Sequence, residues 1–80
     1  MPKNKIKVGD RVHLSMTLQA KESLNAMGLK PRWAGAKVEI TQKAPAGVSF
    51  KFIQDIIKVG PDVAKEYHVG ADHVDNIFHS

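Results

Sequence analysis

The alternation of apolar and polar residues near the N-terminus predicts a short strand that follows a tight turn. Within Arg11–Leu14, Val12 and Leu14 share one face, which is the two-residue period of a half-buried strand. The same alternation occurs over Ile6–Val8, and Gly9-Asp10 between the two segments is typical of a turn. We expect the first strand to begin after this turn.

A helical period follows over Leu18–Met27, a segment without Gly or Pro. Its residues Ala20, Leu24 and Met27 recur at positions i, i+4 and i+7, a spacing that places them on one apolar stripe of a helix. Thr17 has the side chain of a typical N-cap residue. We therefore expect a short helix after Thr17.

The residues that follow predict where this helix ends. Gly28 can adopt the left-handed conformation that stops a helix, which would bring Leu29 into contact with Leu24. Pro31 then prevents the helix from starting again.

A return to alternation predicts a hairpin. Val38 and Ile40 share the inward face of one strand, and Phe50 and Phe52 share that of the next. The intervening segment Ala44–Gly47 has Pro at the second position and Gly at the fourth position of a β-turn.

The last third of the chain carries weaker signals. Ile56–Val59 either extends the hairpin or forms a separate short strand, before a turn at Gly60–Asp62. Val63–Val69 indicates another strand, Gly70–His73 interrupts it, and Val74–Phe78 forms a short last element that turns Ile77 or Phe78 toward the core.

Together these segments predict a mainly β fold with four or five short strands and one helix inserted between the first and second strands. Hairpins dominate and no βαβ unit occurs, so a small closed or nearly closed barrel is the simplest architecture. We expect a flexible N-terminus over residues 1–5 and one domain over residues 6–80.

The order of the segments resembles the SH3-like small-barrel superfold. The opening KVGDRVHL (Lys7–Leu14) is similar to the "GD-R/K-V" first strand of such barrels, and a long excursion precedes GAKVEI (Gly35–Ile40) and the hairpin. The closing EYHVGADHVDNIF (Glu66–Phe78) resembles their strand, one-turn 3₁₀ bend and short terminal strand. The resemblance covers roughly Ile6–Phe78 and implies a five-stranded barrel whose long first loop holds the helix.

The resemblance also bears on function. The ALYDY-like run of signalling SH3 domains is missing, so proline-peptide binding is not expected. A Tudor-type aromatic cage is not expected either, because Phe50 and Phe52 share the inward face. Small bacterial and phage proteins use the superfold as nucleic-acid-binding modules or as accessory subunits of larger complexes, and fold alone does not choose between these uses.

The composition excludes several classes of protein and site. Eighty residues with 42% hydrophobic side chains can close one core. The absence of cysteine excludes disulfides, thiolate metal sites and thiol nucleophiles. No apolar run approaches a membrane span, and the N-terminus lacks the apolar region of a signal peptide. We expect a soluble cytoplasmic protein with no membrane partner.

The net charge of +4 hides an uneven distribution along the chain. Residues 1–53 contain ten basic and three acidic residues, and residues 54–80 contain two basic and five acidic ones, which gives +7 and −3. A dipolar surface, or attraction between the two halves, would follow from this asymmetry.

The sequence carries no catalytic or metal-binding signature. The four histidines match no zinc spacing. Ser49, His68 and Asp72 could be drawn as a triad, but no nucleophile elbow or Gly-rich phosphate loop accompanies them. We expect no enzyme, no metal, no cofactor and no small-molecule substrate.

Two surfaces could instead bind a macromolecule. The leading hypothesis is a binding module that docks on a larger protein through the helical first loop and the cationic, aromatic turn behind it. The docking residues would be Met16, Met27, Lys30, Arg32 and Trp33. The ordinary alternative is that Trp33 belongs to the core and that the methionines only pack the helix on the barrel.

The second hypothesis is nucleic-acid binding through a basic face of the barrel. Outward strand positions and the same turn would supply Arg11, Lys30, Arg32, Trp33, Lys37, Lys43 and Lys51. Lysines outnumber arginines ten to two, so such binding would show little sequence preference.

Overall fold

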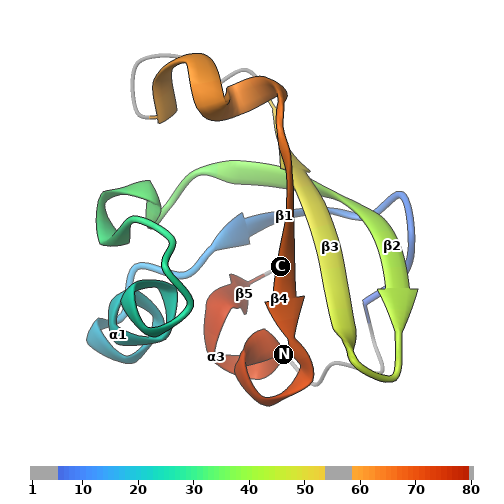
Figure 1. Ribbon diagram of the computed structural model, residues 1–80, viewed down its shortest axis with the longest axis horizontal. Coiled ribbons are helices and arrows are strands. Elements are labelled where there is room, and N and C mark those ends of the chain that lie inside the picture. The colour runs from blue at the N-terminus through green and yellow to red at the C-terminus, as the bar shows by residue number, and fades with distance from the viewer. Residues whose placement is uncertain (1–5, 54–58, 80) are drawn as a thin grey trace.

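The computed structural model describes residues 6–53 and 59–79 and is built on one antiparallel sheet (Figure 1). The strands lie in the order β4-β3-β2-β1-β5. Their bounds are β1 Arg11–Leu14, β2 Lys37–Ala44, β3 Gly47–Phe52, β4 Glu66–Gly70 and β5 Phe78–His79. The helices are α1 Leu18–Ala26, η2 Pro31–Trp33, η3 Gly60–Ala64, η4 Ala71–His73 and α3 Val74–Ile77, of which the η elements are 3₁₀ helices.

The sheet is open between its two edges. Four strands of four to eight residues form most of it, and β5 adds two residues beside β1. Within residues 6–53 and 59–79, β4 and β5 are the edge strands. The chain is therefore mainly β, and the predicted helix between the first two strands is confirmed.

The predicted turn before β1 is present. The amide of Asp10 donates to the carbonyl of Lys7 at 3.0 Å, and the Asp10 carboxylate accepts from the amide of Lys7, also at 3.0 Å. Gly9 has a φ of 93°, which a residue with a side chain rarely adopts.

Both predicted ends of α1 are confirmed. The Thr17 hydroxyl accepts from the amide of Ala20 at 3.1 Å, the N-cap interaction expected of threonine. At the other end Gly28 has a φ of 78°, and the amide of Leu29 donates to the carbonyl of Leu24 at 2.9 Å, which is a Schellman stop.

The β2–β3 hairpin is also confirmed, with Pro45-Ala46 at its turn. Its strands differ from regular alternation at one point, because the register shifts between Ile40 and Gln42. This irregularity gives β2 one extra residue, and such bulges increase the local twist of a strand.

The segment after the hairpin differs from its sequence-based prediction. Val63 lies in η3, so the strand expected from Val63 begins only at Glu66. The physical reason is the pair before it: Gly60 has a φ of 74°, and Pro61 restricts φ to values that suit a helical turn. Residues 1–5 and 56–58, for which a flexible terminus and a strand were predicted, lie outside the described residues.

The closing segment agrees with its prediction in part, because Val74–Ile77 forms a helical turn and the terminal strand begins only at Phe78. Gly70 ends β4, one turn of 3₁₀ helix and one turn of α-helix follow, and β5 then pairs antiparallel with β1 through Phe78 opposite Leu14. Both Ile77 and Phe78 are buried.

The core lies between the inward face of the sheet and the helices α1, η2 and α3 (Figure 1). Helix α1 contacts both α3 and η2. The largest fully buried side chains are Phe50, Phe78, Ile6, Leu14, Leu24, Ile40 and Ile77.

Candidate functional site

The loop between β1 and β2, called the first loop below, is tied to the sheet at both ends. The amide of Leu14 donates to the carbonyl of Ala36 at 2.9 Å, and the amide of Gly35 donates back to the carbonyl of Leu14 at 2.6 Å. On α1, the buried residues Ala20 and Leu24 face the core. The first loop is therefore held against the fold along its length.

Trp33 is part of the core rather than of the surface. Its side chain is 2% exposed, and its ring makes edge-on contacts with Phe52 and Tyr67, with centroids 5.0 and 5.2 Å apart. A buried ring cannot stack on a partner, so the prediction that Trp33 contacts a protein or a nucleic acid is wrong. Among the described residues, nothing accepts a hydrogen bond from its buried Nε1.

The buried indole holds the turn that carries Lys30 and Arg32. The amide of Trp33 donates to the carbonyl of Lys30 at 2.9 Å, and that of Ala34 donates to the carbonyl of Pro31 at 3.1 Å. Lys30 and Arg32, which precede Trp33 in this turn, are both exposed. The turn thus presents two positive charges on a backbone that core packing positions.

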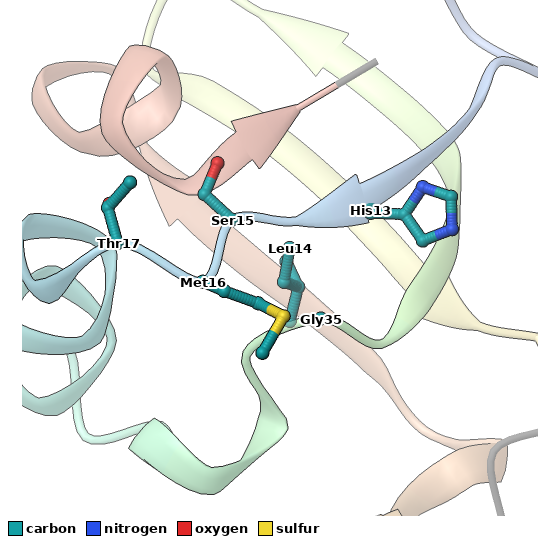
Figure 2. A pocket seen from close by; sticks show the side chains of 6 residues that line it. All are labelled: His13, Leu14, Ser15, Met16, Thr17 and Gly35. Atoms are coloured by element: carbon teal, nitrogen blue, oxygen red, sulfur yellow. The ribbon is translucent and has the colours of Figure 1, made fainter.

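Met16 lies between two grooves, with its side chain 68% exposed. In Figure 2 this side chain extends from the β1–α1 connection across Gly35. The larger groove has a volume of about 540 Å³ and is lined by His13, Leu14, Ser15, Met16, Thr17 and Gly35. The smaller has a volume of about 340 Å³ and is lined by Met16, Lys21, Pro31, Arg32 and Ala34. The grooves bring predicted site residues Met16 and Arg32 together.

The remaining predicted docking residue, Met27, is not part of these grooves. It is partly buried and packs against the core at the end of α1. Its apolar surface contributes to packing, as the ordinary alternative expected.

Sequence reasoning missed Leu18 and Lys21. Leu18 is the first residue of α1 and is 74% exposed. The signal was available, because Leu18 falls on the side of the helix opposite the stripe of Ala20 and Leu24. We call Met16, Leu18, Lys21, Lys30 and Arg32 the first-loop surface.

The outward face of the sheet carries charges of alternating sign. Cross-strand register places Arg11 opposite Glu39, Glu39 opposite Lys51, and Lys51 opposite Glu66. Arg11 Nε lies 3.9 Å from Glu39 Oε1, and the Thr41 hydroxyl donates to Glu66. Two of the predicted nucleic-acid contacts therefore stand beside carboxylates.

The other two strand lysines lie away from this row. Lys37 is the first residue of β2 and stands opposite His13 of β1, and Lys43 is near the hairpin turn; both are exposed. Arg11, Lys37 and Lys51 are outward, as predicted. The register shift after Ile40 instead puts Lys43 opposite the buried Val48, on the other face of the sheet, so the four strand cations do not form one continuous positive stripe.

Ser49 and His68 form a contact between a hydroxyl and an imidazole, the two groups that a Ser-His catalytic pair would use. They are cross-strand neighbours, and Ser49 Oγ lies 3.3 Å from His68 Nδ1. Neither residue lines the two grooves described above. Their contact follows from strand register.

No cofactor-like arrangement emerges in the part of the chain that the structure describes. Over residues 6–53 and 59–79, no three histidine or acidic side chains are grouped so that they could hold a metal ion. Over the same residues, no helix combines the length and hydrophobicity needed to cross a membrane. Comparisons of the chain with protein-family models, curated proteins and solved structures give no match.

Proposed function

We propose that this chain is a non-catalytic binding module that docks on a larger protein through the first-loop surface. The observation that carries the proposal is Met16, an exposed apolar side chain shared by two grooves and flanked in one of them by Lys21 and Arg32. Exposed apolar groups beside a groove are typical of protein interaction sites.

The scaffold for this module is an SH3-like five-stranded small barrel. Three features support this part of the proposal: the antiparallel pairing of β5 with β1, the 3₁₀ turn between β4 and β5, and the long first loop between β1 and β2. In such a barrel the first loop is free to carry a binding surface, because its ends are fixed by the sheet.

A second candidate is sequence-tolerant nucleic-acid binding through the strand cations. The outward, exposed positions of Arg11, Lys37 and Lys51 favour it, and Lys43 is exposed near the hairpin turn. The carboxylates of Glu39 and Glu66 in the same face oppose it, since they repel phosphate at close range. We therefore place this function second.

Site-specific photo-crosslinking tests docking. A photo-crosslinking residue replaces Leu18 on the first-loop surface, and in a matched control it replaces Gln42, an exposed residue of β2. In the native cells we expect one defined protein to be captured from the Leu18 position, not from the Gln42 position. Capture should be lost when Arg32→Glu is added. Equal capture from both positions, or no capture, would overturn the proposal.

A further inference from the structure

We infer that the first-loop surface binds an acidic protein segment that also presents an apolar side chain, an inference that rests on the docking function proposed above. Met16 and Leu18 supply the apolar contact. Lys21 and Arg32 line the neighbouring groove and meet carboxylates of the partner.

The cations of the first loop, unlike Arg11 and Lys51 of the sheet, have no carboxylate opposite them among the described residues. Between Ser15 and Ala36 the chain carries Lys21, Lys30 and Arg32 against one acid, Glu22. Within residues 6–53 and 59–79, none of these three cations forms an ion pair with a carboxylate. An anionic partner is the complement of such a surface.

The apolar part of the surface decides against a phosphate-rich partner. Met16 and Leu18 are 68% and 74% exposed, and covering them is favourable only if the partner brings apolar atoms, at about 25 cal/mol per Å². Nucleic acid would instead gain from an aromatic ring on which a base could stack. Trp33, the aromatic residue of this loop, is 2% exposed and its ring is engaged in the core.

The surface is also preorganised, which reduces the entropic cost of binding. The hydrogen bonds of Leu14 with Gly35 and Ala36 fix the floor of the larger groove, and the buried Trp33 fixes the turn beside Arg32. What remains to be ordered when a partner binds is the exposed side chains of the first-loop surface.

A peptide titration tests the inference. The probe is a fluorescent peptide in which two glutamates alternate with two leucines. It has about 15 residues, near the length at which an isolated helix becomes marginally stable. A matched peptide replaces each glutamate with glutamine, and a third probe is single-stranded DNA of the same net charge. Anisotropy is measured at about 0.1 M salt, where the screening length is about 10 Å.

We expect the acidic peptide to bind at least about tenfold more tightly than the glutamine peptide or the DNA. Arg32→Glu should weaken binding at least about tenfold, and Met16→Gln by about threefold or more. Arg11→Glu on the sheet face is the matched control, because it changes net charge by the same amount, and it should leave the affinity within about twofold. Circular dichroism verifies that each variant is folded.

Several results would overturn the inference. These are equal binding of the two peptides, tighter binding of the DNA, and weakening by Arg11→Glu as large as that by Arg32→Glu. Tighter binding to vesicles of anionic lipid would assign the surface to a membrane. A stable dimer in light scattering that Arg32→Glu dissociates would assign it to a second copy.

The two proposals fail in different ways. Capture from the Leu18 position without peptide binding would keep the docking function and remove the acidic character of the partner. Absence of both capture and peptide binding would remove both.

Discussion

Trp33 shows how one buried side chain can organise an exposed site. Its ring is 2% exposed and contacts Phe52 and Tyr67, while Lys30 and Arg32 beside it face outward. The indole therefore supports the first-loop surface from below without touching a partner. A loss of binding after truncation of Trp33 would report damage to the fold rather than removal of a contact.

We expect Trp33→Ala to lower the free energy of unfolding by about 3–5 kcal/mol, the range for removing a large buried aromatic side chain. Trp33→Phe should cost clearly less, because it keeps an aromatic ring and removes an indole N–H that has no acceptor among the described residues. Urea denaturation measures both. A Trp33→Ala variant within about 1 kcal/mol of wild type would contradict the core role of the ring.

At Gly47 even the addition of one methyl group should destabilise the fold. A Cβ built on it would lie 2.1 Å from the backbone carbonyl oxygen of Val69, and its φ is 149°. We expect Gly47→Ala to cost at least about 2 kcal/mol, since both strain and overcrowding act. Gly28 has a φ of 78° but open space around its Cα, so Gly28→Ala should cost only about 1–2 kcal/mol. Equal costs in denaturation experiments would show that crowding at Gly47 is relieved by strand movement.

At the scale of elements, α1 is held by its ends and by one buried face. Thr17 caps the first turn, and Gly28 ends the helix. Ala20 and Leu24 are 0% exposed, whereas Leu18 on the opposite side is 74% exposed. The helix therefore serves as packing on one side and as part of the first-loop surface on the other.

Thr17→Ala should lower stability by about 1 kcal/mol, because the amide of Ala20 then loses its side-chain acceptor. Thr17→Ser keeps the hydroxyl and should remain within about 0.5 kcal/mol of wild type. Thermal unfolding followed by circular dichroism compares the two. A Thr17→Ala variant as stable as Thr17→Ser would show that water caps the helix equally well.

Elements with strong local signals could be predicted from the sequence, and those decided by long-range packing could not. The cap at Thr17, the stop at Gly28 and the turn at Pro45 depend on residues a few positions apart. The shift in β2 after Ile40 and the helical turn at Val63 depend on how these segments meet their neighbours. The alternation of apolar and polar residues therefore predicts neither the register shift nor the helical turn.

The candidate site was predictable only in part for the same reason. Met16 and Arg32 were identified by residue type, and the structure brings them to one groove. The burial of Trp33 and the packing of Met27 against the core required tertiary contacts. Lys21 joins the groove through the position of η2 beside α1, a contact that no local pattern encodes.

At the scale of the whole molecule, the distribution of charge matters more than its net value. On the sheet, Arg11 and Lys51 alternate with Glu39 and Glu66 in one cross-strand row, whereas the cations of the first loop have no such partners among the described residues. The first loop contributes a net +2 to the +7 over residues 1–53, from Lys21, Lys30 and Arg32 against Glu22. This arrangement favours a local anionic contact over a long basic track.

Neutralising Glu39 and Glu66 should leave the outward face of the sheet with a net positive charge. We expect wild-type protein to bind single-stranded DNA weakly, and the double variant Glu39→Gln, Glu66→Gln to bind it more tightly, with a steeper dependence on salt. Its stability should change by no more than about 1 kcal/mol per exposed pair removed. Anisotropy titrations at several salt concentrations measure both. Tight binding by wild type that the double variant does not improve would favour the nucleic-acid function.

The most direct test of docking at the first-loop surface is an NMR spectrum of the methionine methyl groups. Met16 is 68% exposed between the two grooves, and Met27 packs against the core, so the two methyls report on different surroundings within one sample. When the acidic peptide is added, the Met16 methyl signal should shift further with each addition until the shift saturates. The Met27 methyl signal should stay nearly unchanged. A peptide that binds but leaves the Met16 signal in place, or moves both signals equally, would contradict the account.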